Sequence, residues 1–248
     1  MTRRPKRLPS TAEEAEFLAS YRPGKYPRPA VTVDLAIFSV VEARLQLLLI
    51  KRGGHPFRDH WALPGGFLHV AEERDDQGED LEVAARRELA EETGLDTQGL
   101  FLEQLQTFGR VFRDPRMRVI SVAYVALLPP CRAGEIEAGS DAREVAWLPV
   151  AEIETISLAF DHDEIIDAAV GRLRDDLDRS RLAFELVSEP FTTSELRRVH
   201  ELIEGRTLDA GNFRRRFNRL IERGVVEEAG EERATGHRPA RLYRLVAF

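Results

Sequence analysis

Three glutamates, Glu88, Glu91 and Glu92, lie within five consecutive positions of the sequence. Carboxylates three and four residues apart on a helix repel one another. Partly buried carboxylates need a compensating cation or must take up protons. A hard divalent ion such as Mg²⁺ binds through carboxylate oxygens, so the run predicts a magnesium site. The alternative is a solvated acidic face on a surface helix.

A helix is the element that must position these glutamates. Apolar residues between Leu81 and Leu89 recur at helical spacing, and Gly94 supplies a stop, so the helix is predicted to begin near Glu79. On a wheel of about 100° per residue, the three glutamates share an arc with Leu81 and Ala84. That arc is expected to face the body of the domain.

Two segments resemble the signature of the Nudix hydrolase family. Trp61-Ala62-Leu63-Pro64-Gly65-Gly66 is the first, and the second is the run from Arg87 to Leu95, with Glu79 ahead of it at the family's spacing. Twelve residues separate Gly66 from Glu79 where the family has five. We interpret His69–Gln77 as an insertion in the loop that leads into the helix.

The resemblance implies roles for these residues. The family's glutamates at the positions of Glu88, Glu91 and Glu92 hold Mg²⁺ against a substrate diphosphate, and the arginine at Arg87 orients them, which makes Arg87, Glu88 and Glu91 the catalytic candidates. The predicted ligand-binding residues are Arg52, Gly66, Phe67, Glu79 and Arg113. The insertion puts turnover in question, because a misplacement of about 1 Å can cost on the order of 100-fold in rate.

Strands are predicted at 30–41, 45–51, 101–110, 118–128 and 145–149, where aliphatic and β-branched residues dominate. This order implies an α+β fold or an α/β/α sandwich, and the Nudix resemblance implies the sandwich. The turn Arg113-Asp114-Pro115-Arg116 has two interpretations. It is either a solvated hairpin tip, or Arg113 uses its planar guanidinium to contact a diphosphate or ribose.

The C-terminal segment has the pattern of a winged helix-turn-helix. Thr192 to Ser194 offer caps for a helix that Gly205 ends, and a second helix is predicted from about Asp209 to Arg223. Two strands then follow around a polar tip at 230–236. Helix, turn, helix and hairpin form the winged arrangement.

The second of these helices is apolar on one face and basic on the other, a surface that suits a DNA major groove. The alternative is an arginine stripe that only solvates a surface helix. The candidate DNA contacts are Thr193, Asn212, Arg214, Arg215, Arg216, Arg219, Arg238 and Arg241.

Between the two units, 161–179 predicts an amphipathic helix that could transmit the state of one to the other. We expect His162, at its start, to have no special role. The predicted divisions are an N-terminal basic arm with a short helix (1–29), a Nudix ligand-sensing domain (30–160), a connecting helix (161–180) and a winged helix-turn-helix domain (181–248). The arm is either a loose tail or a contact to a phosphate backbone or partner subunit.

Charge and composition support two units with different partners. The chain of 248 residues carries a net charge of −7, divided into +2 from Arg181 onward and −9 before it. The only cysteine, Cys131, cannot form an internal disulfide, which fits a reducing cytoplasm. No apolar run predicts a transmembrane helix or a secretory signal, so we expect no membrane contact.

A Nudix domain followed by a winged helix resembles the Nudix-related transcriptional regulators that control NAD metabolism. The residues that carry this resemblance are Trp61 to Phe67, Leu102 to Leu105, Phe108-Gly109, Arg113 to Arg116, Asn212 to Arg215, Arg238 to Ala240 and Leu242-Tyr243. It implies a homodimeric repressor that releases a palindromic DNA operator when ADP-ribose or a related NAD-derived nucleotide binds. The rival hypothesis is a Mg²⁺-dependent ADP-ribose pyrophosphatase with an accessory C-terminal domain.

Overall fold

The structure is a computed structural model that describes residues 11–70, 78–136, 142–177, 181–234 and 239–246. Its centre is a seven-stranded mixed sheet with the strand order β3-β2-β1-β6-β5, in which β4 pairs with β1 and β7 with β2. The long central strands β1 and β6 run parallel, and the other pairs are antiparallel. The strands are β1 Ala30–Val41, β2 Arg44–Arg52, β3 Trp61–Ala62, β4 Gly65–Phe67, β5 Phe101–Phe108, β6 Val119–Leu127 and β7 Ala142–Pro149.

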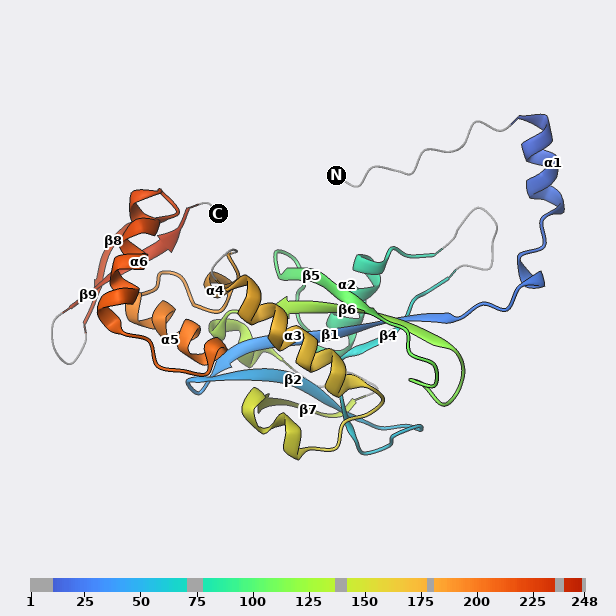
Figure 1. The fold of residues 1–248 in the computed structure, drawn as a ribbon, viewed down its shortest axis with the longest axis horizontal. Helices are drawn as coiled ribbons and strands as arrows, with labels where there is room; N and C mark the ends of the chain where they lie inside the picture. Colours follow the sequence, from blue (N-terminus) through green and yellow to red (C-terminus); the bar gives the residue numbers. More distant parts are fainter. Residues whose placement is uncertain (1–10, 71–77, 137–141, 178–180, 235–238, 247–248) are drawn as a thin grey trace.

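Helices cover both faces of this sheet, so the predicted α/β/α sandwich is confirmed (Figure 1). The side chains of a strand alternate between its faces, and β1 sends Val33, Leu35 and Ile37 toward α2 (Leu81–Thr93). Its other face sends Ala36 and Phe38 toward α3 (His162–Asp176). The short helices η2 (Pro130–Glu135) and η3 (Val150–Thr155) complete the edges.

The helix α2 begins at Leu81, two residues after the predicted start. Asp80 has extended backbone angles at the N-cap, and Gly94 ends the helix in the left-handed conformation that glycine adopts at low cost. Glu79 therefore precedes the helix. Of the interpreted insertion, residues 71–77 lie outside the described part of the chain.

The C-terminal unit has the predicted winged helix-turn-helix order. It consists of α4 (Leu182–Glu185), α5 (Thr193–Glu204), α6 (Ala210–Glu222) and the hairpin β8 (Val226–Arg233) with β9 (Ala240–Leu245). Thr192 and Glu195 form a reciprocal capping box at the start of α5, and Asp209 caps α6. The tip predicted at 230–236 is wrong at its first end, because β8 continues through Gly230 to Arg233 past an irregularity in its pairing.

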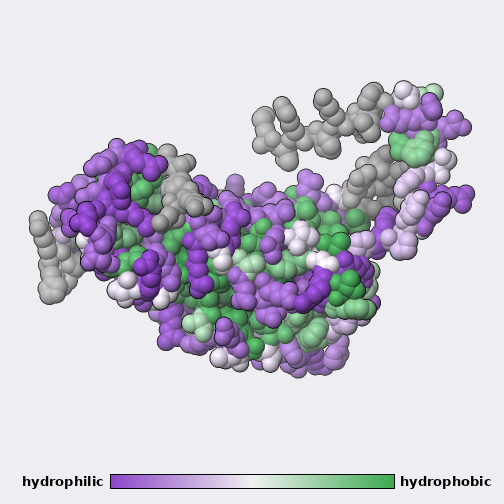
Figure 2. Space-filling view, viewed as in Figure 1, coloured by the Kyte–Doolittle hydropathy of each residue, from purple (hydrophilic) through white to green (hydrophobic). Residues whose placement is uncertain are grey.

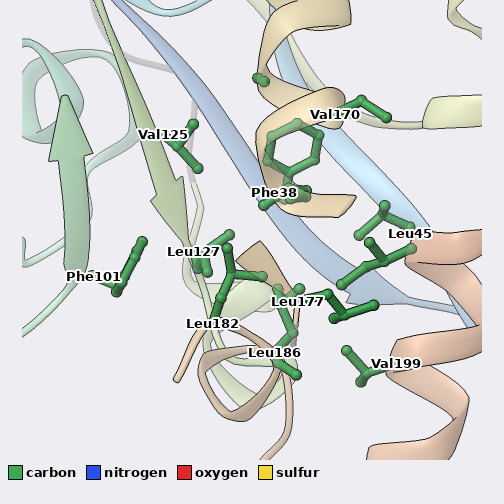
Figure 3. Close-up of a cluster of buried hydrophobic side chains, with 14 of the residues drawn as sticks. Phe38, Leu45, Phe101, Val125, Leu127, Val170, Leu177, Leu182, Leu186 and Val199 are labelled. Atoms are coloured by element: carbon green, nitrogen blue, oxygen red, sulfur yellow. The ribbon is translucent and has the colours of Figure 1, made fainter. Parts of the chain in front are cut away.

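One hydrophobic core joins the two units (Figure 3). The cluster includes Phe38 of β1 and Val170 of α3, and it continues through Leu45 and Leu177 to Val199 of α5. All of these side chains are buried. Arg198 also donates a hydrogen bond of 3.2 Å to the carbonyl of Ala43 in the β1–β2 turn. The winged helix is therefore packed against the sandwich rather than tethered to it by a free linker.

The N-terminal helix α1 (Ala12–Ser20) stands clear of the sandwich on a connector that contains the short helix η1 (Pro23–Lys25) (Figure 1). Thr11 caps it by accepting a hydrogen bond from the backbone of Glu14. No residue of α1 is buried. Within the described ranges, no helix has both the length and the apolarity needed to span a lipid bilayer.

Candidate functional site

Arg87 is the hub of the carboxylate cluster on α2. Its guanidinium binds Glu79 through two hydrogen bonds, of 2.6 and 3.0 Å, and donates to Glu88 at 2.8 Å and Glu91 at 3.1 Å. The hydrogen bonds from Arg87 lower the pKa of the Glu79 carboxyl to about 2. Glu79 thus anchors the arginine that orients the glutamates, although it lies outside the helix.

Gly66 lies directly against the carboxyl end of Glu88, because β4 packs on α2 at this point. A Cβ atom placed on Gly66 would lie 2.3 Å from Oε1 of Glu88, closer than any real contact. The neighbouring Gly65 donates its N–H to Glu92 at 2.8 Å. The Gly65-Gly66 strand therefore holds two of the three glutamates from one side.

Only two of the three glutamates face the body of the domain. Glu88 is buried and Glu92 is partly buried, but the side chain of Glu91 is 58% exposed, so the expectation that all three share an inward arc is wrong for Glu91. Desolvation raises the pKa of Glu88, and it raises the pKa of Glu92 to about 8. Burial therefore favours the protonated form of this inner pair.

These carboxylates do not form a preassembled magnesium site. Within the described residues, no group of three or more His, Cys, Asp or Glu side chains is close enough together to hold a metal ion. Arg87 already binds an oxygen of Glu88 and one of Glu91. Arg87 would have to release these oxygens before the glutamates could share a Mg²⁺ ion, so the predicted metal set remains a prediction.

A buried ion network lies behind the glutamates. Arg113 is buried and donates to Asp161 at 2.7 and 3.0 Å and to Asp34 at 3.3 Å. Ser121 donates a short hydrogen bond to Asp34. The interpretation of Arg113 as a solvated hairpin tip is therefore wrong, and its guanidinium is held by two carboxylates at the wall of the cavity described below.

His162 is part of this network, which overturns the expectation that it has no special role. It is buried at the start of α3, and its Nδ1 accepts a 2.8 Å hydrogen bond from the backbone N–H of Leu63, between β3 and β4. Its Nε2 lies 3.7 Å from Asp34. Burial lowers the pKa of His162, so its ring is neutral at physiological pH. The hydrogen bond to Leu63 thereby joins the start of α3 to the loop between β3 and β4.

A cavity of about 160 Å³ opens beside Glu92 and this network. Its cationic wall consists of Arg52 and Arg116, which pack on Phe160 with ring-centroid distances of 4.8 and 5.8 Å. Arg116 also lies 5.4 Å from the ring centre of Phe67. Burial and the charge of Arg116 lower the pKa of Arg52. Two partly desolvated guanidiniums around one aromatic ring suit an anion such as a diphosphate.

The structure places four of the five predicted ligand residues, Arg52, Gly66, Phe67 and Arg113, on the lining of this cavity. Glu79 lies away from it as the anchor of Arg87. Sequence reasoning missed Asp34, Asp114, Arg116, Phe160 and His162. Asp34 had a usable signal, because it is the only charged residue in a strand whose other residues are apolar except Thr32 and Ser39.

We expect the stability of the metal-free protein to fall as pH rises through the titration of Glu92. Its folded pKa of about 8 lies above the ordinary value of 4.5, so the folded state holds an extra proton between these values. The free energy of unfolding should therefore be lower at pH 8.5 than at pH 5, by up to a few kcal/mol. Urea unfolding in the presence of a chelator measures it.

The neutral isostere Glu92→Gln provides the control for this titration. It should remove most of the difference between pH 5 and pH 8.5, while Glu91→Gln, at an exposed site, should leave that difference unchanged. Equal pH dependence in the native chain and in Glu92→Gln would show that Glu92 ionises normally.

The exposed face of α6 is the candidate DNA surface. Phe213 and Phe217 are buried beneath it, which confirms the predicted apolar stripe. The exposed side is basic and polar, and Arg215 donates a hydrogen bond to Asn212. A groove along α6 and the turn before it is lined by Arg206, Thr207, Leu208, Asp209, Asn212, Phe213, Arg215, Arg216 and Arg219. Figure 2 shows a strongly hydrophilic surface over this end of the molecule.

The predicted DNA contacts differ in how exposed their side chains are. Arg214, Arg215 and Arg219 are exposed, whereas Arg216 is half-buried and lies 3.2 Å from Nδ1 of the buried His200. Thr193, the first residue of α5, is half-buried. In the wing, Arg241 pairs with Glu228 at 2.6 Å, and Arg238 lies outside the described residues. The exposed arginines of α6 are therefore the most available cations.

The fold and the glutamate helix define a Nudix domain that carries a winged helix. The family described as NUDIX domain matches residues 31–169, and the NrtR DNA-binding winged helix domain matches residues 183–245. The chain belongs to the Nudix family, in the branch that carries the NrtR winged helix.

Relatives that resemble the whole chain combine the same two units. The "ADPR responsive transcriptional repressor NtrR" of Acinetobacter baylyi is 39% identical over 94% of this chain and 88% of its own length. The structure of Shewanella oneidensis NrtR complexed with a 27mer DNA superposes with a TM-score of 0.71 and 34% identity, over 87% of this chain and 93% of that one. The NUDIX domain of the same protein complexed with ADP ribose gives a TM-score of 0.56 and 35% identity, over 64% of this chain and 98% of that one.

Proposed function

We propose that this protein is a transcriptional repressor that binds operator DNA through α6 and releases it when ADP-ribose binds the Nudix domain. The observation that carries the proposal is the single hydrophobic core that joins a unit whose cavity has an arginine wall to a unit with an exposed arginine face. The likeness to an ADP-ribose-responsive repressor and to a DNA complex along most of the chain supports it.

ADP-ribose is proposed to place its diphosphate between Arg52 and Arg116. Both guanidiniums lie on Phe160, and the ring excludes water from one side of each charge. Glu92 and Asp34 lie across the same cavity, where they can accept hydrogen bonds from ribose hydroxyls. The cavity is smaller than the usual ligand pocket of about 300–1,000 Å³, so the ligand extends over the neighbouring surface.

DNA is proposed to lie along the exposed face of α6. A helix of this size enters the major groove of B-DNA, where arginines read guanine edges and phosphates. A homodimer would present two such helices to the half-sites of a palindromic operator. Arg214, Arg215 and Arg219 are the proposed contacts, with Asn212 and Thr193 beside them. Arg216 is proposed as a support for α6 because it points toward His200.

Helix α3 is the proposed route between the two sites. Its first residues, with the adjoining Asp161, belong to the ion network beside the cavity. Near its other end, Arg174 donates a hydrogen bond of 3.2 Å to the carbonyl of Ile203 in α5. A ligand that shifts the start of α3 would thus reposition the winged helix. Only a ligand that binds the two placements with different affinity can shift their populations.

Hydrolysis of ADP-ribose is the second candidate, because Arg87 holds Glu79, Glu88 and Glu91 in one network and Glu92 lines the cavity. A Mg²⁺ cofactor belongs to this candidate. It predicts rapid formation of AMP from ADP-ribose with added Mg²⁺, and loss of that activity in Glu92→Gln. The repressor proposal predicts slow turnover at most, with ADP-ribose binding retained in the variant.

Selection of genomic DNA fragments by the purified chain tests the repressor proposal. We expect enrichment of a small set of fragments that share a palindrome, and reduced recovery when ADP-ribose is present. A chain that recovers no fragment above random DNA at moderate salt, while it cleaves ADP-ribose rapidly, would favour the hydrolase.

A further inference from the structure

Helix α1 buries none of its residues against the described part of its own chain. It has nine residues, and an isolated helix shorter than about 12–15 residues is marginal in water. Phe17, Leu18 and Tyr21 are about half exposed or more. Figure 2 shows hydrophobic surface over this part of the molecule. A short helix with exposed apolar side chains gains stability from a partner that covers them.

The loop between β5 and β6 (residues 109–118) also exposes apolar side chains to water. Phe112 is 89% exposed, and Val111 and Met117 are exposed beside it. Phe112 also adopts a φ of +66°, a conformation that costs a non-glycine residue free energy. Backbone strain that presents an apolar ring to water points to a binding role for that ring.

The charges of the two surfaces match. Helix α1 contains three glutamates and no basic residue, so it carries −3. In residues 109–118, Arg113 is buried in its ion network and Asp114 is buried against Arg116, whereas Arg110, Arg116 and Arg118 are exposed, so the exposed side of the loop is basic. Arg110 pairs with Glu164, but both side chains are largely exposed, and such pairs are weak. An acidic apolar helix and a basic apolar loop therefore occur in one chain without covering one another.

The connector favours contact between copies over contact within one copy. It contains three prolines between Tyr21 and Ala30, and proline-rich linkers are semi-rigid. Figure 1 shows α1 directed away from the sheet on this connector. The backbone N–H of Ala30 donates a 3.0 Å hydrogen bond to the carbonyl of Arg118. The connector therefore meets the sheet beside the 109–118 loop of its own chain, and α1 of that chain leaves this loop exposed.

We propose that α1 of each copy docks on the 109–118 loop of the other copy in a homodimer. The contact is self-complementary, as the twofold symmetry of most dimers requires. The same loop carries Arg113 and Arg116 of the cavity wall, so the partner's helix would lie next to the nucleotide site. This inference rests on the proposed homodimer and assigns one of its contacts.

Thiol cross-linking between two differently tagged copies tests the contact. Cys131 is the only cysteine, so Cys131→Ser gives a background without thiols. One copy then carries Ser20→Cys and the other Pro115→Cys, exposed positions that keep both aromatic rings, and the two are co-expressed and treated with a short bis-maleimide. We expect a cross-linked product that contains one copy of each. The pair Ser20→Cys with Val83→Cys, an exposed apolar position on α2, is the matched control.

A mixed product no more abundant than the Val83 control would overturn the proposal. A chain that carries both Ser20→Cys and Pro115→Cys should likewise cross-link to a second chain; closure within one chain would show that α1 folds back on its own loop. A chain that sediments as a monomer would remove the homodimer as well, whereas a dimer without the cross-link would remove only this contact.

Sedimentation of point variants gives a second readout. Because an aromatic anchor dominates many interfaces, Phe112→Ser should raise the dissociation constant of the dimer by at least about 10-fold. Val83→Ser should leave it unchanged. An unchanged constant for Phe112→Ser, with the fold intact by circular dichroism, would count against the proposal.

Discussion

Replacement of Arg215 and Arg219 by alanine is expected to weaken operator binding by about 100-fold or more. Each arginine that contacts a base or phosphate contributes about 1–3 kcal/mol. Both side chains lie on the exposed face of α6 and line its groove. Fluorescence anisotropy with a labelled operator measures the loss, and the slope of affinity against salt should fall by about 1 for each phosphate contact removed.

Two exposed arginines of the Nudix domain supply the matched control. Arg44→Ala with Arg58→Ala removes the same charge outside the winged helix, and it should change operator affinity little. ADP-ribose binding should be unaltered in both double variants. Equal losses in the two would mean that net charge, rather than the face of α6, holds the DNA.

Arg113→Leu is expected to lower the free energy of unfolding of the Nudix domain by about 3–5 kcal/mol. The change leaves Asp34 and Asp161 buried without their shared cation, and an uncompensated buried charge has a cost of this size. Urea unfolding followed by tryptophan fluorescence isolates the effect, because both tryptophans, Trp61 and Trp147, lie in strands of this domain.

A triple variant separates charge from packing. Arg113→Met combined with Asp34→Asn and Asp161→Asn removes the whole ion network while it keeps similar side-chain volume, so most of the lost stability should return. Arg44→Met, whose partner Glu152 is exposed, should cost much less. If the triple variant were as unstable as Arg113→Leu, lost packing rather than an unpaired charge would be the cause.

The elements were predictable where one residue type repeats at a regular interval. The apolar face of α3 and the buried stripe of α6 appear both in the sequence and in the structure. Capping residues such as Thr192 and Gly205 set the ends of α5. The predicted ends of helices and strands were less accurate where tertiary contacts determine the boundary. The wing strand β8 runs past Gly230 because β9 pairs with it.

The site was predictable where its residues lie on one element. The glutamates of α2 were found, but their burial differs because β4 packs on Glu88 and leaves Glu91 in solvent. The network of Asp34, Arg113 and Asp161 draws on β1, a loop and the start of α3. The spacing of these residues along the chain does not reveal that they lie together in space, and the same holds for Arg116 and Phe160.

Titration of ADP-ribose into the complex of the protein with its operator tests the central claim most directly. The account predicts that saturating ADP-ribose weakens operator binding by at least about 10-fold, within the usual range of allosteric coupling. By reciprocity, operator DNA should weaken ADP-ribose binding by the same factor. Operator affinity that is unchanged or increased when ADP-ribose is bound would contradict the account.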